Sequence, residues 1–217
     1  MAKKGTIVID AGHGGKDPGT KSATTQEKSI TLDIAQLTHT ALTSQATTGG
    51  DDVTVLMTRD SDVFLELADR PAVAKTNDAD IFLSIHCNAN NEKTAELDKK
   101  RGVTAFVRRV DEATVPVESR QTDALVAVDE TLANAVVNAV YLAIQTHDSN
   151  AAKLDIQRSG MAVLNRQYLG TKAKGCLLEV EFIDVPAVEV LLNTGANHVQ
   201  VRTDIAAAIA KTLIDSL

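Results

Sequence analysis

A single histidine stands in a glycine-rich loop near the start of the chain. His13 follows the β-branched run Ile7–Ile9 and lies in the segment Gly12-His-Gly-Gly15. A short apolar run that ends in such a loop is typical of a strand whose carboxyl end carries a functional site. Two nucleotide-binding patterns do not fit: Lys16 is followed by Asp17 rather than by serine or threonine, and Asp17 also stands where a dinucleotide loop has its third glycine. His13 is therefore a candidate metal ligand or catalytic base.

Two more titratable residues stand where predicted elements begin or end. Glu27 begins a predicted helix, and His86 follows an almost wholly apolar strand. Two imidazoles and one carboxylate, with a fourth position open, form the ligand set of a hydrolytic zinc site. Each residue also has a simpler explanation: His13 could cap backbone groups, Glu27 could favour a helix N-terminus, and His86 could be a core histidine. No His-Glu-x-x-His motif is present, so the spacing alone leaves both interpretations open.

An acidic pair interrupts an apolar strand near the other end of the chain. In Leu177-Leu-Glu-Val-Glu-Phe182, the alternation of a strand puts Glu179 and Glu181 on one face. Burying two carboxylates is costly unless each is paired, solvated or close to a cation. A zinc site would supply the cation, and a carboxylate beside it would be a general base for amide hydrolysis. The alternative is a strand edge with solvated acids.

Strands and helices alternate along the chain and must position these residues. The predicted strands are Ile7–Ile9, Val53–Met57, Ile81–Ile85, Gly102–Val107, Met161–Leu164 and Cys176–Phe182. One predicted helix begins at Glu27. The others cover Leu67–Asn77, Leu125–Ile144, Pro186–Leu192 and Val199–Leu217. This order predicts an α/β fold: a twisted, largely parallel or mixed sheet of about six strands, flanked by helices on both faces.

Composition limits the organisation and the partners of the chain. Its 217 residues suit a single domain, 1–217, and the formal net charge of −7 and the absence of tryptophan argue against nucleic acid as a partner. Cys87 and Cys176 form no Cys-x-x-Cys pair and are expected to be small buried hydrophobes. We expect no membrane insertion, because no segment reaches transmembrane length. Met1–Gly5 leads into the first strand without a signal-peptide core, so we expect either synthesis in the cytoplasm or a domain trimmed from a longer protein.

Five phrases occur in an order that resembles one protein family. They are Ile7-Val-Ile-Asp-Ala-Gly-His-Gly-Gly-Lys-Asp-Pro-Gly19, Glu27-Lys28, Thr58-Arg-Asp60, Phe82-Leu-Ser-Ile-His-Cys-Asn-Ala89 and Leu178-Glu-Val-Glu-Phe182. Together they resemble the zinc-dependent N-acetylmuramoyl-L-alanine amidases of the Amidase_3 family, over nearly the whole chain. The resemblance implies one Zn²⁺ ion with ligands His13, Glu27 and His86, and it implies that Glu179 is the catalytic glutamate. Arg70, in the Leu-x-x-Arg pattern, and Asn88 are implied to support the site or to contact substrate.

The same resemblance implies a reaction and a setting. The chain is expected to hydrolyse the amide between N-acetylmuramic acid and L-alanine of the peptidoglycan stem peptide, with no obligate protein partner. Without a signal peptide, the chain would reach the cell wall by release, as a phage-type endolysin does, or by delivery through a secretion machine. Its origin, as a phage endolysin or as a cellular autolysin, stays open. Two alternatives remain: a metallopeptidase of related fold that cleaves another wall peptide bond, and a non-catalytic wall-binding or regulatory domain.

The chain departs from the family pattern around the acidic strand. Glu181 replaces the usual glycine, and Asp184-Val185 replaces the usual Ser-Asn after Phe-Ile. Glu181 is therefore expected either to raise the pKa of Glu179 by like-charge repulsion or to occupy a substrate pocket. The stretch Asn88–Gly102 is too short for the extra helix that plugs regulated members of the family, so an open site is expected.

Overall fold

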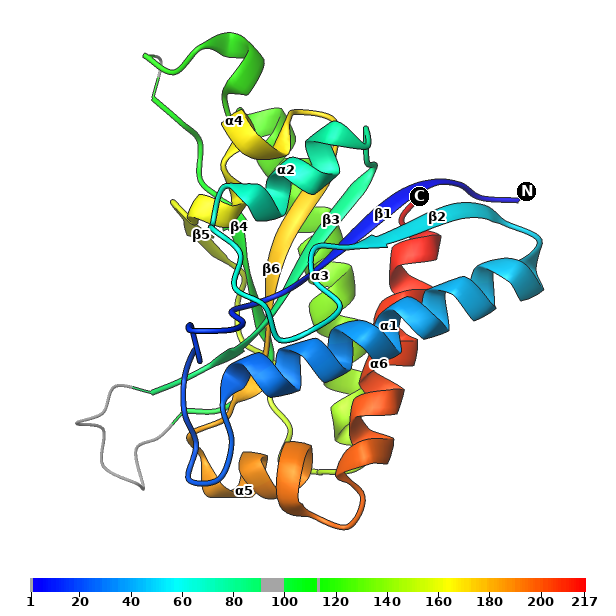
Figure 1. Ribbon diagram of the computed structural model, residues 1–217, viewed down its shortest axis with the longest axis vertical. Coiled ribbons are helices and arrows are strands. Elements are labelled where there is room, and N and C mark those ends of the chain that lie inside the picture. Colours follow the sequence, from blue (N-terminus) through cyan, green and yellow to red (C-terminus); the bar gives the residue numbers. More distant parts are fainter. Residues whose placement is uncertain (1, 91–99, 113) are drawn as a thin grey trace.

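Six strands form one mixed sheet in the computed structural model, which describes residues 2–90, 100–112 and 114–217. The strands are β1 (Lys4–Ala11), β2 (Asp52–Met57), β3 (Ile81–Asn88), β4 (Thr104–Arg108), β5 (Gln157–Ser159) and β6 (Lys174–Phe182), and their order across the sheet is β2-β1-β3-β6-β4-β5 (Figure 1). Neighbours are parallel except for the antiparallel pair β4 and β6. The predicted mixed sheet is confirmed.

The helices connect the strands. They are α1 (Glu27–Gly49), α2 (Asp69–Thr76), α3 (Asp123–Gln145), α4 (Arg166–Leu169), α5 (Pro186–Glu189) and α6 (His198–Asp215). Three short helical segments have other geometries: η2 (Val117–Ser119) and η3 (Ala162–Leu164) are 3₁₀ helices, and η4 (Val190–Thr194) is a π-helix. Thr122 caps α3, because its hydroxyl accepts a hydrogen bond from the N–H of Leu125.

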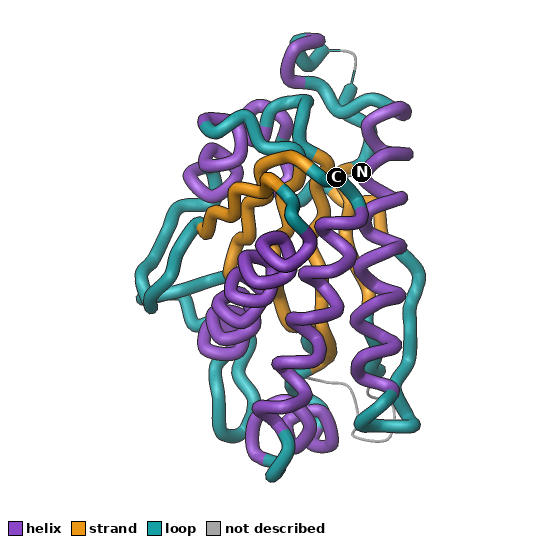
Figure 2. The backbone as a smooth tube through the Cα atoms, turned by 90° about the vertical axis from the view of Figure 1, so that its right-hand side faces the viewer, coloured by secondary structure: helices purple, strands orange, loops and turns teal. Residues whose placement is uncertain are grey.

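Each face of the sheet has its own apolar core, which confirms that helices flank both faces. Ile7, Leu83 and Leu178 point toward α1, α3 and α6, the long helices that lie in front of the sheet in Figure 2. Val8, Phe82 and Leu177, one position along each strand, point to the opposite face and pack with residues of α2, α4 and η3. This alternation also puts Glu179 on the face of Leu177, the face covered by the shorter helices.

Helix α3 differs from the sequence-based expectation about membrane spans. The stretch Val117–Gln145 is long and apolar enough to cross a membrane by length and composition, with a mean hydropathy of 1.3 in its most apolar window. Its side chains Leu132, Val136 and Val140, however, are at most 2% exposed and form part of the core beneath β4 and β6. The helix is therefore apolar because it packs on the sheet.

Three predicted elements differ from the structure. Met161–Leu164 is not a strand but leads into η3, where Val163 and Leu164 are buried; the nearby strand is β5. A short apolar run does not by itself distinguish a strand from another buried segment. The predicted helix Pro186–Leu192 is divided into α5 and the π-helical segment η4. Cys87 and Asn88, predicted to begin a loop, belong to β3, and residues 91–99 of that predicted loop lie outside the described residues.

The parallel strands β1, β3 and β6 end at one edge of the sheet. Ala11 pairs with Ile85, and His86 pairs with Glu179, so residues distant in sequence are neighbours there. Cys87 and Cys176 are buried free thiols, as expected, and burial raises the pKa of both. The chemistry of this edge therefore depends on the histidines and carboxylates.

Candidate active site

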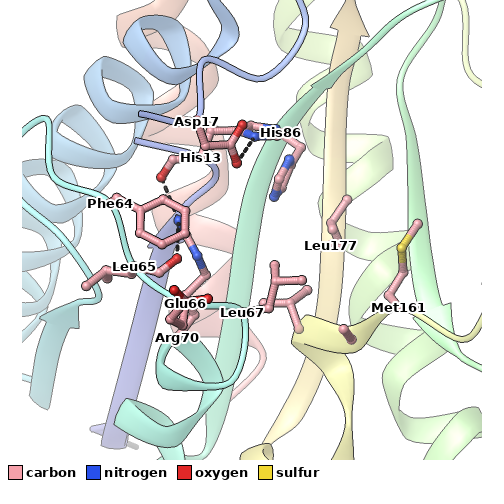
Figure 3. A pocket seen from close by; sticks show the side chains of 12 residues that line it. His13, Asp17, Phe64, Leu65, Glu66, Leu67, Arg70, His86, Met161 and Leu177 are labelled. Carbon is pink, nitrogen blue, oxygen red and sulfur yellow. Dashed lines mark hydrogen bonds and ion pairs between the residues drawn. The ribbon is translucent and has the colours of Figure 1, made fainter. Parts of the chain in front are cut away.

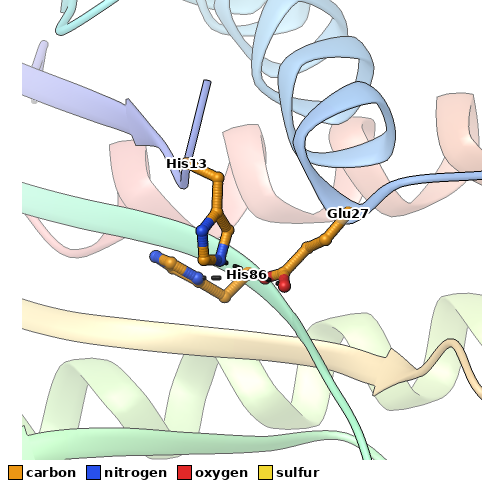
Figure 4. A group of neighbouring side chains, drawn as sticks. All are labelled: His13, Glu27 and His86. Atoms are coloured by element: carbon orange, nitrogen blue, oxygen red, sulfur yellow. Dashed lines mark hydrogen bonds and ion pairs between the residues drawn. The ribbon is translucent and has the colours of Figure 1, made fainter. Parts of the chain in front are cut away.

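Three side chains with metal-binding atoms converge at the carboxyl edge of the sheet. His13 comes from the loop after β1, Glu27 from the first residue of α1 and His86 from β3 (Figure 4). The Nε2 atom of His13 lies 3.0 Å from Oε2 of Glu27, and Nδ1 of His86 lies 3.0 Å from Oε1. The structure therefore brings together all three predicted ligands, each contributed by a different element.

The spacing of these atoms fits a small cation. One ligand atom from each residue lies within 4.8 Å of the others. Nitrogen and oxygen ligands about 2.0–2.2 Å from a tetrahedral zinc ion lie roughly 3.3 Å from one another, so a small adjustment would accommodate the ion. Glu27 is also held by the N–H groups of Cys87 and Thr20, which donate to its two oxygens at 2.9 Å. The carboxylate is thus fixed before any ion arrives.

The charges of the cluster match this geometry. Burial alone would raise the pKa of Glu27, but the hydrogen bonds and charges of His13 and His86 outweigh burial and hold that pKa well below its usual range. Burial alone would lower the pKa of His13, whereas Glu27 and Asp17 outweigh burial and raise it. Glu27 is therefore an ionised carboxylate, the form that binds a cation.

The loop around His13 is held in an unusual conformation. His13 has a φ of 62°, in the left-handed region that side chains other than glycine seldom adopt. Asp17 accepts a hydrogen bond from Nδ1 of His13 at 2.9 Å, which directs Nε2 toward Glu27. A Cβ atom on Gly12 would lie 2.5 Å from Nε2 of His86, and one on Gly19 would lie 2.6 Å from Oε2 of Glu27. Two glycines are thus required by close contact with the ligands.

Two buried arginines hold the backbone of this loop. Arg70, predicted to order the site, donates to the carbonyl oxygens of Ala11 at 2.7 Å and His13 at 2.6 Å, and to Asp10 at 3.1 Å. Arg59 donates to the carbonyl oxygens of Ala11 and Gly12 at 2.9 and 2.7 Å. Both side chains are 3% exposed. They fix the main chain from Ala11 to the histidine ligand itself.

Glu179 lies beside the ligand cluster on β6. Its Oε2 atom is buried and has no hydrogen-bond partner among the described residues. Burial raises the pKa of Glu179 to about 7, and the negative charge of Glu27 adds to that effect against the opposing influence of the histidines. A carboxyl group that titrates near neutrality can take up and release a proton under physiological conditions.

Glu181 lies away from this cluster. Its side chain is fully buried and accepts hydrogen bonds from the guanidinium of Arg101 at 2.8 and 3.1 Å and from the N–H of Gly102 at 2.7 Å. Arg101 also pairs with Asp148. Glu181 is absent from the groups that shift the pKa of Glu179. The expectations of repulsion with Glu179 or of a place in a substrate pocket therefore find no support in the contacts of Glu181, which is a buried ion-pair residue.

Asn88 lies at the end of β3, where it lines a shallow hollow together with Glu27 and Glu179. Its carboxamide oxygen accepts a hydrogen bond from the N–H of Ala89.

Sequence reasoning missed the roles of Asp17 and Arg59. The spacing of His13 and Asp17 was a detectable signal, because a carboxylate four residues after a loop histidine can orient its ring. The partners of Arg59 are carbonyl groups of another loop, and no pattern of residue types indicates them.

Loss of the carboxylate that orients His13 should weaken metal binding. We expect Asp17→Ala to lower the affinity for zinc by about 10–100-fold, because Nδ1 of His13 loses its acceptor. Competition with a chromophoric chelator would measure the affinity. Asp60→Ala, at an exposed residue of the neighbouring loop, is the matched control and should bind zinc as the unmodified chain does. Equal affinities of the two variants would contradict this role of Asp17.

The raised pKa of Glu179 predicts a pH-dependent stability difference in the metal-free protein. Because the folded state keeps the carboxyl proton up to about pH 7 whereas the unfolded chain releases it near 4.5, the unmodified chain loses stability as pH rises through this interval. Glu179→Gln cannot ionise, so its free energy of unfolding relative to the unmodified chain should rise over this interval by up to roughly 3 kcal/mol. Urea unfolding at pH 5 and pH 8 with chelator present would measure it. A difference that does not change with pH would contradict the assignment.

The fold and the site together define a class: an α/β domain with a two-histidine, one-glutamate cluster and a buried carboxyl group at the carboxyl edge of its sheet. The chain belongs to the N-acetylmuramoyl-L-alanine amidase family, whose sequence model matches residues 7–211. The resemblance expected from the motifs is confirmed.

Curated relatives agree with this assignment, and a solved structure has a similar fold. Over 83 residues, 38% of the chain, it is 47% identical to the endolysin of Bacillus phage SPP1 and 45% identical to the sporulation-specific N-acetylmuramoyl-L-alanine amidase of Bacillus subtilis. These matches span 29% and 31% of the relatives' own lengths. The fold is similar to that of an N-acetylmuramoyl-L-alanine amidase from Clostridium difficile 630, with a TM-score of 0.74, 22% identity and coverage of 99% and 97% of the two chains.

Proposed function

We propose that this chain is a zinc-dependent N-acetylmuramoyl-L-alanine amidase, which hydrolyses the amide between N-acetylmuramic acid and L-alanine of peptidoglycan. Membership of the family supports the substrate class. The observation that carries the reaction is the buried Oε2 of Glu179, which lies beside the cluster of His13, Glu27 and His86 and has no hydrogen-bond partner in the part of the chain that the structure describes. A buried carboxyl without a partner is costly to maintain, so its position indicates a chemical role. We take residues 1–217 as a single catalytic domain.

The proposed roles follow from the contacts of each residue. His13, Glu27 and His86 would hold one zinc ion, and Asp17 and Arg70 keep the first of these ligands in place. When bound, zinc supplies Lewis acidity that polarises the amide carbonyl and makes the attacking water more acidic.

Glu179 would transfer the proton that the reaction requires. Its Oε2 takes a proton from water as the oxygen of that water bonds to the carbonyl carbon. Oε2 then gives this proton to the nitrogen as the carbon–nitrogen bond breaks. The products are the carboxylic acid of N-acetylmuramic acid and the amine of L-alanine, and passage of the acid proton to the amine leaves a carboxylate and an ammonium group. A pKa near neutrality suits both transfers.

Two measurements test this function. Mass spectrometry of digested peptidoglycan should find free stem peptides that begin with L-alanine, and metal analysis should find one zinc ion per chain. Fragments cut within the stem peptide would instead indicate a metallopeptidase. Intact peptidoglycan with a metal-loaded, folded protein would indicate a non-catalytic wall-binding or regulatory domain.

The proposal extends to partners and location. We expect the purified chain to digest peptidoglycan alone, without nucleic acid, membrane insertion or an obligate protein partner. One structural relative, the CwlD amidase from Clostridioides difficile, was solved in complex with the GerS lipoprotein, so addition of other proteins is a useful comparison. The relatives include a phage endolysin. We propose that the chain acts on the cell wall after phage-type release or delivery by a secretion machine.

A further inference from the structure

An apolar cavity of about 410 Å³ adjoins the ligand cluster (Figure 3). Phe64 and Leu67, from the segment between β2 and α2, form one side of it, and Met161 and Val163 of the η3 region form the other. Leu177 of β6 lies between them, two residues before Glu179 on the same strand face. The volume lies in the range of sites that enclose small ligands.

A second hollow, more open and more polar, contains the ligand cluster, because His13, Glu27 and His86 all line it. It is lined by residues that include Thr20, Asn88 and Glu179. The cavity and this polar hollow share His13, Asp17 and His86. They therefore adjoin at these residues and form one groove, with a polar half that holds the ligand cluster and an apolar half beside it.

Glu179 distinguishes the two halves. Among the described side chains, Glu179 lines the polar hollow but not the apolar cavity. If Glu179 delivers a proton to the departing nitrogen, the amine portion of the substrate must leave on the polar side. The acyl portion then extends in the opposite direction, into the apolar cavity.

The chemistry of the substrate matches this orientation. On the acyl side, the carbonyl group is followed by the lactyl carbon with its methyl group and ether oxygen, which offer little hydrogen bonding. On the amine side, L-alanine is followed by amides and carboxylates, which need polar partners or water. The apolar walls suit the first and the open polar hollow suits the second.

We propose that the apolar cavity is the subsite for the acyl side of the scissile bond and binds the lactyl methyl group of N-acetylmuramic acid. This inference rests on the proposed amidase function. It assigns Leu67 and its neighbours as specificity-determining residues and places the stem peptide in the polar hollow beside Asn88.

Paired substrates test the orientation. The unmodified, zinc-loaded chain is compared on N-acetylmuramoyl-L-alanyl-D-isoglutamine, on its analogue with hydrogen in place of the lactyl methyl group, and on its analogue with glycine in place of L-alanine. Loss of a methyl group that fits an apolar pocket should lower kcat/KM by about 10-fold or more. In Leu67→Ser the lactyl preference should fall by about threefold or more, while the preference for L-alanine over glycine stays unchanged.

Two further variants make the result decisive. Leu142→Ser on α3 is the matched control, because Leu142 is 49% exposed and Leu67 is 59% exposed. Leu142→Ser should leave both preferences unchanged. Ala162→Trp should fill the cavity and remove the lactyl preference. As a readout apart from turnover, calorimetry should find weaker binding of N-acetylmuramic acid to Leu67→Ser and unchanged binding of L-alanyl-D-isoglutamine.

The contrary outcomes are distinct. A change in the L-alanine preference in Leu67→Ser, with the lactyl preference intact, would put the stem peptide in the cavity and overturn the proposal. Unchanged preferences in both cavity variants would show that the cavity is not a subsite. If the unmodified chain cleaves none of the muramyl amides, the proposed function itself fails, and the inference fails with it.

Discussion

Replacing Glu179 by glutamine is expected to lower kcat by about 10²–10⁴-fold, the usual contribution of a general acid–base group. The carboxamide has nearly the shape of the carboxyl group but cannot take a proton from water. Because Glu179 is not one of the three clustered ligands, the variant should still bind one zinc ion with unchanged affinity. Muropeptide release and metal stoichiometry, measured on the same preparation, would check both parts. An active Glu179→Gln enzyme would remove Glu179 from the proposed role.

Glu181→Gln is the matched comparison, because it makes the same change two residues along the strand. Glu181 is fully buried and pairs with Arg101. Removal of one partner of a buried ion pair typically costs about 3–5 kcal/mol. This variant should therefore lose thermal stability while its kcat at a permissive temperature stays within about threefold of the unmodified value, since no proton-transfer group is lost. The opposite pattern would exchange the roles of the two glutamates.

Gly12→Ala is expected to abolish tight metal binding and to lower activity by about 100-fold or more, through displacement of a ligand. The added methyl group would lie 2.5 Å from Nε2 of His86, too close for the ring to remain in place. The backbone cannot retreat freely, because Arg59 donates a hydrogen bond to the carbonyl oxygen of Gly12. His86 must therefore rotate away from Glu27. Zinc titration and peptidoglycan digestion would measure the two losses.

Gly160→Ala controls for the substitution itself. A Cβ atom on Gly160 would be 3.8 Å from its nearest neighbour, Arg109, an ordinary contact. This variant should keep its metal and its activity. If Gly12→Ala binds zinc as tightly as Gly160→Ala does, the ring of His86 is not held against the loop as the structure has it.

The sheet could be predicted because its central strands are apolar on both faces. Runs such as Ile7–Ile9 and Ile81–Ile85 are typical of buried strands and indicate burial in any case. Met161–Leu164 was misassigned for the same reason, since Val163 and Leu164 are buried by packing against α4 and β6 rather than by strand pairing. A short apolar run therefore predicts that a segment is buried more directly than it predicts the backbone conformation of that segment.

The candidate ligands could be named because the family motifs carry them, but their surroundings could not. The sequence places Glu181 as a second acid near Glu179, whereas in the structure Glu181 pairs with Arg101, eighty positions away in sequence. Only the folded arrangement shows that Oε2 of Glu179 lacks a hydrogen-bond partner among the described residues. Contacts of this kind are set by packing between distant segments, which residue types and spacing do not encode.

The distribution of the three ligands over separate elements makes cation binding a property of the folded chain. His13, Glu27 and His86 meet only after β1, α1 and β3 have docked, because no two of them are neighbours in sequence. An unfolded chain offers the ion isolated side chains, whereas the folded chain offers a complete set. By mass action, the ion then favours the folded population by an amount that grows with its concentration. If the proposed zinc site is correct, scarcity of the ion would limit the persistence of the fold as well as its chemistry.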